Sequence, residues 1–481
     1  MSDPLSLTDE LADFRRLLAV PERELPALSG LFDGAELGRI ARAPGRLDVM
    51  GGIADYSGSL VLELPIREAA WVAVATHPEP LVRIATVDKD ARQARSFEAP
   101  LAAFSEGTLA EYESACAYFR AEPARRWAAY IAGTLLVLMR ERGLRPTRGL
   151  RILLASDVPE GKGVSSSAAI EVAAMQAVAA TFGLQLGEVE LAQLCQRVEN
   201  RVVGAPCGLM DQMTASCGRE DKLLELLCQP SRIQGQLAVP EDIEFFGIDS
   251  GVRHQVTGAD YGQVRVAAFM GYRMIADACG LPASVLEAGR VRVDDARYGG
   301  YLANVTPSEY ARRFRNILPA ALDGRAFLDR FGGSTDDVTR IESDRSYPIA
   351  SATEHAIFEH FRVRTFAELL SAAPRNSRRL EQLAELMYQS HASYSACGLG
   401  CRHTDLLVDL VQRAPQESGL LGAKITGGGS GGTVAILARA GARTAVQRVA
   451  DEYGTETGHS PYVFAGSSPG AAEYGSHSFG G

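Results

Sequence analysis

The spacing of apolar residues along the chain predicts both helices and strands. Apolar side chains three and four positions apart, as at Leu11, Phe14 and Leu18, are typical of amphipathic helices. Helices are predicted over residues 5–20, 166–182, 186–201, 264–278 and 378–394. Runs of β-branched and other apolar residues predict strands at 36–48, 60–66, 70–76, 150–155, 243–249 and 432–437.

The order of these elements predicts an α+β fold. Helices and strands mix without the regular alternation of a doubly wound parallel sheet, and no internal repeat is visible. Just before residue 236 a Gln-Pro-Ser-Arg segment gives way to a new strand pattern. We therefore expect an N-terminal domain over residues 1–235 and a C-terminal domain over residues 236–481. The last stretch, from about Gly466, is rich in glycine and serine.

The composition excludes several classes of protein. Of the 481 residues, 46% are hydrophobic and 22% are charged, which is ordinary for a globular protein and excludes disordered, collagen-like and disulfide-rich chains. The net charge of −10 argues against nucleic-acid binding, and it means that a polyanionic substrate must meet local positive groups. The eight cysteines lack the spacing of a zinc site or a disulfide scaffold, so we expect reduced thiols.

The chain gives no signal for export or for membrane insertion. Its first residues lack the basic segment and apolar core of a signal peptide. The longest apolar stretch, residues 168–184, contains Glu171 and is typical of a buried helix rather than of a membrane span. We therefore expect a cytoplasmic protein without a membrane partner.

The first of three glycine-rich loops covers residues 43–58 and lies between two predicted strands. Gly45 and Gly58 are explained well by turns. Arg46, Asp48 and Asp55 are harder to explain in this way, because three charges stand among apolar neighbours. Buried charges either pair with one another or serve a site.

The second loop, residues 158–169, is preceded by a strand and followed by a helix. Gly161 and Gly163 allow close approach of the backbone, and Ser165, Ser166 and Ser167 place hydroxyl and N–H groups at the helix N-terminus. Such an arrangement can hold phosphate groups. It is not a Walker A sequence, because Lys162 is followed by glycine and the upstream glycine is missing.

The third loop, residues 424–433, contains five glycines. Gly428 to Gly432 fits the G-x-S-x-G pattern of hydrolases, but that motif requires a helix after the serine. A strand-like run, Thr-Val-Ala-Ile-Leu, follows instead, which argues against a hydrolase. The glycines indicate a backbone that packs closely against another loop or a ligand.

Taken in this order, the three loops resemble the three motifs of the GHMP small-molecule kinases. The segment Gly204-Ala-Pro-Cys-Gly-Leu-Met-Asp-Gln212 is similar to the one that carries the catalytic aspartate in the galactokinase branch. Residues 45–62, 247–254, 393–400 and 466–471 are more similar still to the kinase portion of the L-arabinokinases. The resemblance extends from about Arg42 to about Gly470.

The resemblance implies a fold and a catalytic centre. It implies an S5-domain-2-like N-terminal domain and a ferredoxin-like C-terminal domain, with ATP and a sugar bound in the cleft between them. Asp211 would face the anomeric hydroxyl as a base or an electrostatic partner, and Arg46 would stabilise the transferred phosphoryl group. Ser167 and Glu199 would hold Mg²⁺. The ATP phosphates would lie against Gly161, Lys162, Gly163, Ser165, Ser166 and Ser167.

The same resemblance implies where the sugar and the nucleobase bind. Asp55 and Tyr261 would form hydrogen bonds to sugar hydroxyls, with Gly208 in the same pocket. Trp127 resembles the aromatic residue beside the nucleobase, although aromatic residues at that spacing are at least as often part of a core.

Gly52 and Ile53 are a departure that bears on the substrate. Galactokinases carry Glu-His at these positions, and the glutamate addresses the exocyclic hydroxymethyl group, which L-arabinopyranose lacks. The loss of the carboxylate favours the pentose, because an unpaired buried carboxylate is costly. We therefore expect an L-arabinose 1-kinase. A galactokinase or a broader sugar 1-kinase is the alternative, and a non-catalytic sugar and ATP sensor is a third. The oligomeric state is open.

Overall fold

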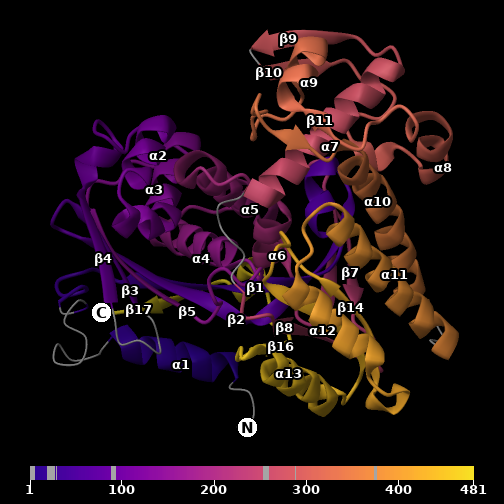
Figure 1. Ribbon diagram of the computed structural model, residues 1–481. Coiled ribbons are helices and arrows are strands. Elements are labelled where there is room, and N and C mark those ends of the chain that lie inside the picture. Colours follow the sequence, from indigo (N-terminus) through magenta and orange to yellow (C-terminus); the bar gives the residue numbers. More distant parts are fainter. Residues whose placement is uncertain are drawn as a thin grey trace.

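A computed structural model describes residues 6–18, 28, 30–87, 94–252, 259–287, 289–372 and 376–480. Helices and strands form two sheets with helices packed on each, together with a smaller segment at one end (Figure 1). The arrangement is α+β, as the element order predicts. No helix among the described residues is long and apolar enough to cross a membrane.

The first sheet has eight strands and is mainly antiparallel. Its order is β17-β1-β2-β5-β3-β4, with β6 paired to β2 and β7 paired to β6. The strands are β1 (Gly38–Met50), β2 (Leu60–His77), β3 (Leu81–Val87), β4 (Ala94–Pro100), β5 (Gly149–Ser156), β6 (Lys222–Leu227), β7 (Arg232–Ala238) and β17 (Ser476–Phe479).

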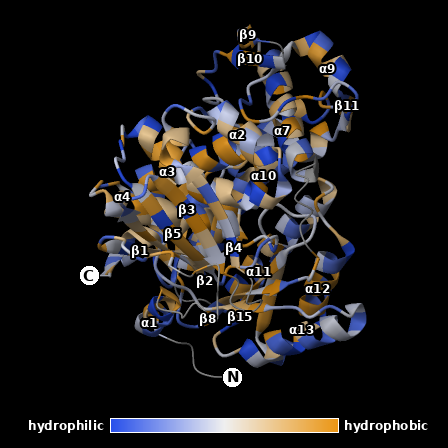
Figure 2. Ribbon diagram, turned by 90° about the vertical axis from the view of Figure 1, so that its left-hand side faces the viewer, coloured by the Kyte–Doolittle hydropathy of each residue, from blue (hydrophilic) through white to orange (hydrophobic). Residues whose placement is uncertain are grey.

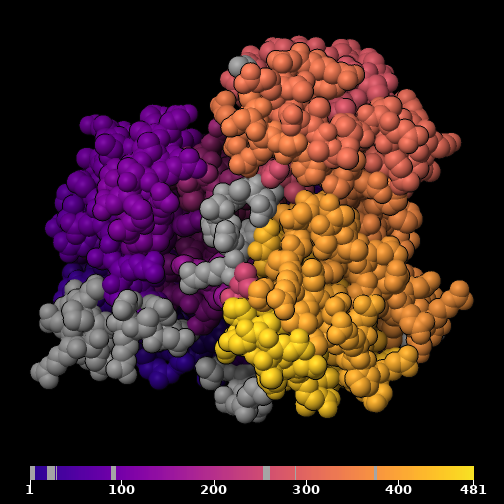
Figure 3. All heavy atoms as spheres, viewed as in Figure 1, coloured from indigo at the N-terminus to yellow at the C-terminus, as the bar shows by residue number. Residues whose placement is uncertain are grey.

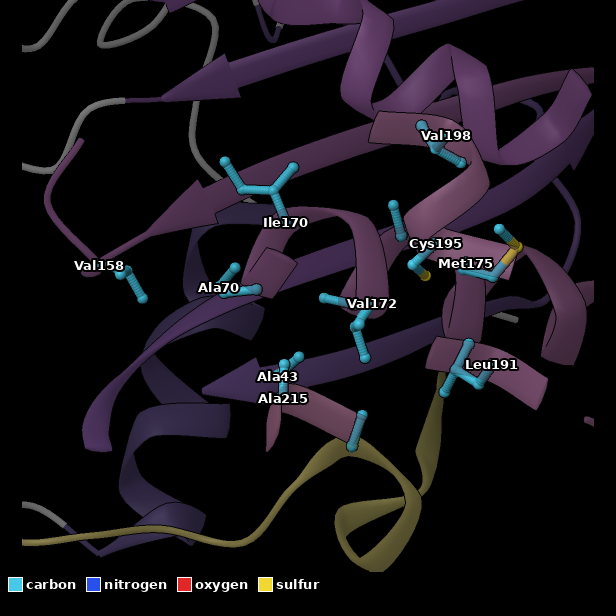
Figure 4. Packing of buried hydrophobic residues seen from close by; sticks show 14 of the residues in the cluster. Ala43, Ala70, Val158, Ile170, Val172, Met175, Leu191, Cys195, Val198 and Ala215 are labelled. Carbon is cyan, nitrogen blue, oxygen red and sulfur yellow. The ribbon is translucent and has the colours of Figure 1, made fainter. Parts of the chain in front are cut away.

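Alternating side chains of the first sheet pack on its two faces. Ala70 and Val72 point into the largest cluster of buried apolar residues, whereas Trp71 belongs to a second cluster with Phe14. The helices α2 (Tyr112–Arg120), α3 (Ala129–Glu141), α4 (Ser166–Thr181), α5 (Glu188–Arg197) and α6 (Met210–Cys217) lie on the first face, and α1 (Leu7–Leu18) lies on the other (Figure 1). Figure 4 shows Val172 of α4 among its apolar neighbours in this core.

Strand β2 differs from the prediction. The sequence predicts two strands, at 60–66 and 70–76, but Leu60–His77 forms one strand of 18 residues. Arg67 and Glu68, which lie between the two predicted strands, are half-buried residues within it. The strand stays continuous because its first half pairs with β6, its second half pairs with β5, and β1 runs beside both.

The predicted helix over residues 186–201 also differs. It is an α-helix only from Glu188 to Arg197 and continues as a π-helix over Val198–Val203. Such single-turn π segments are frequent at functional sites. This one carries Glu199.

The second sheet is antiparallel, with the order β14-β15-β8-β16. Its strands are β8 (Ile243–Asp249), β14 (Leu420–Ile425), β15 (Thr433–Arg439) and β16 (Val463–Ala465). The helices α11 (Ser377–Ala396), α12 (Arg402–Arg413) and α13 (Arg443–Thr457) pack on it, and α10 (Ile349–Ser371) packs against α11, α7 (Ala259–Ala278) and β2. Figure 2 shows the outer helices with hydrophobic and hydrophilic residues on opposite faces, as expected for helices that cover a core.

The remaining elements lie mostly at the far end of α7 (Ala259–Ala278) (Figure 1). They are β9 (Ala283–Glu287), β10 (Gly289–Val293), α8 (Pro307–Glu309), β11 (Leu322–Asp323), α9 (Gly324–Phe331), β12 (Gly333–Ser334) and β13 (Ser346–Tyr347). Short π and 3-10 turns, among them η2 (Gly52–Ser57) and η4 (Pro123–Ala128), connect the larger elements.

The two halves of the chain lie side by side (Figure 3). The glycine- and serine-rich tail, however, returns to the first sheet: α14 (Ala471–Tyr474) packs there, and β17 pairs with β1. Strand β7 crosses residue 235 within that same sheet. The division at 235/236 stays a prediction.

Candidate active site

Arg46 and Asp211 form an ion pair between the first strand and the start of α6. Arg46 Nε donates to Asp211 Oδ1 at 2.8 Å, and Arg46 Nη1 donates to the carbonyl oxygen of Gly163 at 2.6 Å. The Ser165 hydroxyl donates to the other oxygen of Asp211. The arginine is buried, whereas the Asp211 side chain is 24% exposed. The accessible carboxylate is therefore joined both to a buried cation and to the second glycine-rich loop.

A second carboxyl group, that of Glu63, lies behind this pair. Its Oε2 is 3.4 Å from Arg46 Nε, and the side chain is fully buried. Neither carboxyl oxygen has a hydrogen-bond partner in the described part of the chain. Burial, followed by the charge of Asp48, holds the pKa of Glu63 well above its ordinary value. The sequence analysis did not single out this residue, because its neighbours in β2 are those of an ordinary apolar strand.

Asp48, two residues after Arg46, has a different environment. Its Oδ2 accepts from Lys424 Nζ at 2.8 Å, and both side chains are fully buried. Its Oδ1 accepts from the backbone N–H of Gly52 at 3.0 Å. The third glycine-rich loop is thus tied to the first by a buried ion pair.

The second loop has the backbone form that its glycines allow. Gly161, Gly163 and Ser165 all have positive φ, at 72°, 74° and 59°. The third loop supports it from behind: Thr433 Oγ1 donates to the Lys162 carbonyl at 2.8 Å, and a Cβ at Gly432 would lie 2.9 Å from that oxygen. The third loop therefore packs against the second, as its glycines predict.

The side chains of this loop are engaged in different ways. Lys162 Nζ lies 2.7 Å from Asp249 Oδ2, so its charge is already paired within the protein. Ser166 Oγ donates to the carbonyl of Val158 at 3.2 Å, within the turn itself. The Ser165 hydroxyl donates to Asp211, and the Ser167 side chain lies close enough to Glu199 to lower the pKa of that carboxyl.

Glu199 and Ser167 are brought together, as predicted for a pair of metal ligands. Burial and the nearby Asp211 raise the pKa of Glu199 to about 7. Gln212 Nε2 donates to Glu199 Oε2 at 2.6 Å and to Glu171 Oε2 at 3.3 Å. Burial, with Glu199 as the next cause, holds the pKa of Glu171 well above its ordinary value. Two carboxyl groups and an amide thus gather here, and their oxygen atoms are of the kind that a divalent cation such as Mg²⁺ binds.

No group of three or more histidine, cysteine or acidic residues among those described could hold a metal by itself. A cation at Glu199 would thus need further oxygen ligands. ATP phosphates and water are the usual ones for Mg²⁺. The residues present fit a metal that arrives with a nucleotide.

Asp55 lies on the other side of Asp211, in the turn η2. Burial and the charge of Asp211 raise its pKa to about 7. A Cβ at Gly208 would overlap the Asp55 carboxylate, so only glycine fits there. Tyr261 is also near, and its ring packs edge-on against Tyr56 with centroids 5.8 Å apart. Asp55, Gly208 and Tyr261, three of the residues predicted to bind the sugar, therefore lie together.

Arg265 belongs to this group as well, although the sequence analysis missed it. Its Nε and Nη2 donate to the two carboxylate oxygens of Asp336 at 2.9 and 2.8 Å. Its guanidinium carbon lies 5.5 Å from the centroid of the Tyr56 ring, and its charge acts on Asp55. Tyr261 and Arg265 are one helical turn apart, and this spacing was the signal available in the sequence.

Gly52 and Ile53, which were predicted to determine the choice of sugar, pack against the C-terminal half of the chain. Ile53 is buried in an apolar cluster that contains Tyr394, Leu399 and Ile425 of the C-terminal half. Gly52 has a φ of +42°, and a Cβ there would overlap the Tyr394 hydroxyl. Ile53 is therefore part of a core, and position 52 faces Tyr394.

Trp127, predicted to lie beside the nucleobase, is half-buried in η4 and packs against the largest apolar cluster. Tyr130, one turn later, lies close to Glu199 and Glu171, whose charges add to burial in raising its pKa. All eight cysteines are unpaired, in agreement with the expected reduced thiols.

Comparison with known proteins agrees with this geometry. Residues 129–219 match the GHMP kinases N terminal domain, residues 366–455 match the GHMP kinases C terminal region, and residues 30–76 match the galactokinase galactose-binding signature. The galactokinase of Chloroflexus aurantiacus is 30% identical over 90% of this chain and 94% of its own length. The chain belongs to the GHMP kinase family, and the resemblance inferred from the loops is confirmed.

A second relative is more similar in sequence. The L-arabinokinase of Arabidopsis thaliana is 44% identical over 94% of this chain. The chain spans 48% of the length of that protein.

The fold has close counterparts among solved structures. Lactococcus lactis galactokinase complexed with galactose superposes with a TM-score of 0.69 at 19% identity, covering 93% of this chain and 97% of its own. Methanococcus jannaschii mevalonate kinase gives a TM-score of 0.56 at 16% identity, with 89% and 97% covered. These likenesses confirm the predicted two-domain GHMP kinase fold.

Proposed function

We propose that this protein is an ATP-dependent sugar 1-kinase that converts L-arabinose to L-arabinose 1-phosphate and ADP. The main observation in favour of kinase chemistry is that Asp211 contacts both Arg46 and Ser165, a residue of the second glycine-rich loop. The choice of L-arabinose is supported by the relative of that specificity, which is 44% identical, against 30% for a galactokinase.

Phosphoryl transfer requires positioning and charge neutralisation more than covalent chemistry. In the proposed reaction the anomeric hydroxyl lies at the exposed carboxylate of Asp211, which accepts its proton or orients it. Arg46 holds Asp211 at 2.8 Å and contributes positive charge where the phosphoryl group moves. The N–H groups at the start of α4 and the loop backbone from Gly161 to Ser167 hold the phosphates.

Glu199 and Ser167 are the residues that would hold Mg²⁺, which supplies positive charge to the nucleotide phosphates. The proximity of Ser167 to Glu199 supports this assignment, and so does the raised pKa of Glu199, because a bound cation would favour the ionised carboxylate that burial disfavours. Gln212 orients Glu199 through its 2.6 Å hydrogen bond. Lys162 acts indirectly, since Asp249 already pairs with it.

On the sugar side, Asp55 accepts hydrogen bonds from ring hydroxyls, and Tyr261 and Gly208 complete the pocket. Asp55 is buried beside Asp211 and has room there only because residue 208 is glycine. Gly52 and Ile53 contribute by packing against the C-terminal half rather than by contact with the sugar.

Galactokinase activity is the second candidate, favoured by the galactose-binding signature over residues 30–76. A non-catalytic sensor is a weaker candidate, because Arg46, Asp211, Glu199 and the three serines of the second loop are all present, and Asp211 contacts both Arg46 and Ser165.

The test is ADP release with ATP and Mg²⁺ across L-arabinose, D-galactose, D-fucose and other aldoses, with Asp211→Asn as the matched inactive control. The proposal requires kcat/KM to be highest for L-arabinose. A higher value for D-galactose would make the protein a galactokinase, and no release with any aldose would support the sensor.

A further inference from the structure

Tyr394 of α11 is fully buried and reaches from the C-terminal half to the turn that carries Asp55. Its hydroxyl oxygen accepts a hydrogen bond from the backbone N–H of Ile53 at 2.9 Å. The same hydroxyl donates to the carbonyl oxygen of Gly427 at 3.1 Å. One hydroxyl group therefore joins η2 to the third glycine-rich loop.

Both ends of this link lead directly to the site. Asp55 lies two residues after Ile53, in the same short turn. A Cβ at Gly427 would lie 2.9 Å from the Gly163 carbonyl and 3.3 Å from Arg46 Nη2, so this glycine packs against the arginine and the phosphate loop. Among the described residues, no hydrogen bond joins Tyr394 to Asp55 or to Arg46.

The same hydroxyl is the nearest of three atoms that restrict residue 52 to glycine, the others being Asp48 Oδ2 and Tyr394 Cζ at 2.8 Å. Gly52 has a φ of +42°, which disfavours other residues, and a Cβ would overlap the Tyr394 oxygen. The Tyr394 ring is fixed from the other side, with Lys424 Nζ 5.3 Å from its centroid and His355 packed edge-on at 5.1 Å. The ring thus has little freedom to move away from a side chain at position 52.

We propose that Tyr394 is a positioning residue whose hydroxyl locks the sugar-side turn to the loop behind Arg46, and that it keeps position 52 free of any side chain. The inference rests on the proposed function, in which Asp55 binds the sugar and Arg46 acts on the phosphoryl group. Loss of the hydroxyl leaves the Ile53 N–H and the Gly427 carbonyl without their partner in a buried place. The turn that carries Asp55 and the loop that packs against Arg46 are then held in place less firmly.

The first test is Tyr394→Phe, which removes only the hydroxyl. The KM for the better sugar substrate should rise about 10-fold and kcat should fall about 10-fold, because each effect corresponds to one or two lost hydrogen bonds. The matched control is Tyr347→Phe. Tyr347 is also buried, and its hydroxyl accepts from the backbone N–H of Glu342 at 2.8 Å, but it lies in β13, away from the site.

The control should lower the melting temperature as much as Tyr394→Phe does, because each variant removes a buried hydrogen bond. It should leave kcat and KM within about 2-fold of wild type, because the hydrogen bond of Tyr347 lies away from the site. Equal kinetics for Tyr394→Phe and Tyr347→Phe would overturn the proposal, because Tyr394 would then be a purely structural residue.

The second test is a double-mutant cycle of Gly52→Ala with Tyr394→Phe. Gly52→Ala should lower kcat/KM by at least about 10-fold more in the Tyr394 protein than in the Tyr394→Phe protein, because the overlapping oxygen is absent in the latter. Equal losses in the two backgrounds would show that the Tyr394 hydroxyl is not what excludes side chains at position 52, and would overturn that part of the proposal, since the ring carbon and Asp48 Oδ2 at 2.8 Å remain in both.

These measurements separate the proposal from the substrate assignment. They use whichever of L-arabinose and D-galactose the wild-type protein prefers. A preference for galactose would overturn the proposed substrate and leave the effect of the Tyr394 hydroxyl measurable. Wild-type kinetics in Tyr394→Phe would overturn the lock and leave the substrate assignment intact.

Discussion

Strand β1 carries two acid–base pairs whose environments differ. Arg46 pairs with Asp211, whose side chain is 24% exposed. Asp48, two residues later, pairs with Lys424, and both side chains are fully buried. The chemical groups are nearly the same, yet only the first pair presents a carboxylate to a ligand. The exposure of the carboxylate to solvent, rather than the type of residue, distinguishes the pair that can react from the pair that stabilises the fold.

The cost of burial explains the division of roles. The two charges of a fully buried ion pair attract each other strongly, because the dielectric constant around them is low. When one partner is lost, however, the other remains as an unpaired buried charge, which is strongly unfavourable. Asp48 accordingly makes further hydrogen bonds, to the N–H groups of Gly52 and Gly427. Asp211 keeps an exposed surface for the sugar instead. The first two of five predictions test this distinction, and the other three test the metal and sugar sites beside the exposed pair.

Lys424→Met should have the largest effect on stability. It leaves the Asp48 carboxylate buried without its cation, which should lower the free energy of unfolding by about 3–5 kcal/mol. Urea unfolding followed by circular dichroism measures the change. The double variant Asp48→Asn, Lys424→Met should recover part of the loss, because no unpaired charge remains. A Lys424→Met protein as stable as wild type would contradict the structural role.

Asp211→Asn should have the opposite profile. Turnover should fall about 100-fold or more, in line with the loss of a general base or its electrostatic equivalent. Stability should fall less than in Lys424→Met, because Asp211 is partly exposed and the Glu63 carboxyl still lies 3.4 Å from Arg46 Nε. Steady-state ADP release and a thermal melt of the same sample provide both readings. Arg46→Ala should also lower kcat more than it raises the KM for the sugar. If Arg46→Ala altered only sugar affinity, the arginine would bind substrate rather than act on the phosphoryl group.

Glu199→Gln and Ser167→Ala should raise the Mg²⁺ concentration needed for half-maximal activity. An increase of about 10- to 100-fold is expected, the range found when the groups around a metal are altered. The measurement is a Mg²⁺ titration at fixed ATP. Ser166→Ala is the matched control, because the Ser166 hydroxyl bonds to Val158 and not to Glu199. Unchanged titrations for both test variants would move the metal site elsewhere.

Sugar binding should depend on pH through Asp55, whose pKa is raised to about 7 by burial and by Asp211. If the ionised carboxylate accepts the sugar hydroxyls, affinity should weaken about 10-fold from pH 8 to pH 6, as protonation removes that form. Calorimetry without ATP or Mg²⁺ isolates this group from Glu199. Asp55→Asn should bind weakly at every pH, and a pH dependence that persists in this variant would assign the effect to another residue.

The same group should affect stability in the opposite direction. Because the folded protein holds this proton more tightly than the unfolded chain, where the pKa is 3.8, stability should fall as pH rises from about 4 to about 7. The decrease should be smaller in Asp55→Asn.

Much of the site could be predicted from local sequence. The glycines and serines of the second loop, followed by an alanine-rich run, predict a phosphate-binding turn before a helix, and α4 does begin at Ser166. The third loop was correctly distinguished from a hydrolase motif, since β15 follows it. These inferences succeed because they depend on neighbours within a few residues, whose backbone preferences are set by the residues themselves.

Predictions about individual side chains were less complete. Lys162, predicted at the nucleotide, also pairs with Asp249. Ile53, predicted at the sugar, packs in an apolar cluster. Arg265 and Glu63 were not anticipated. In each case the deciding partner lies in another element, and a single sequence contains no signal for which distant residues meet.

The sequence by itself determined the family, the three loops and the charged residues that the loops carry. The tertiary structure decided which of those charges stay accessible. Asp48 meets Lys424 across 376 residues of chain, and Ile53 meets Tyr394 across 341. The physical reason is burial: whether a charge is exposed, paired or excluded depends on the packing of both halves of the molecule, which no local pattern specifies.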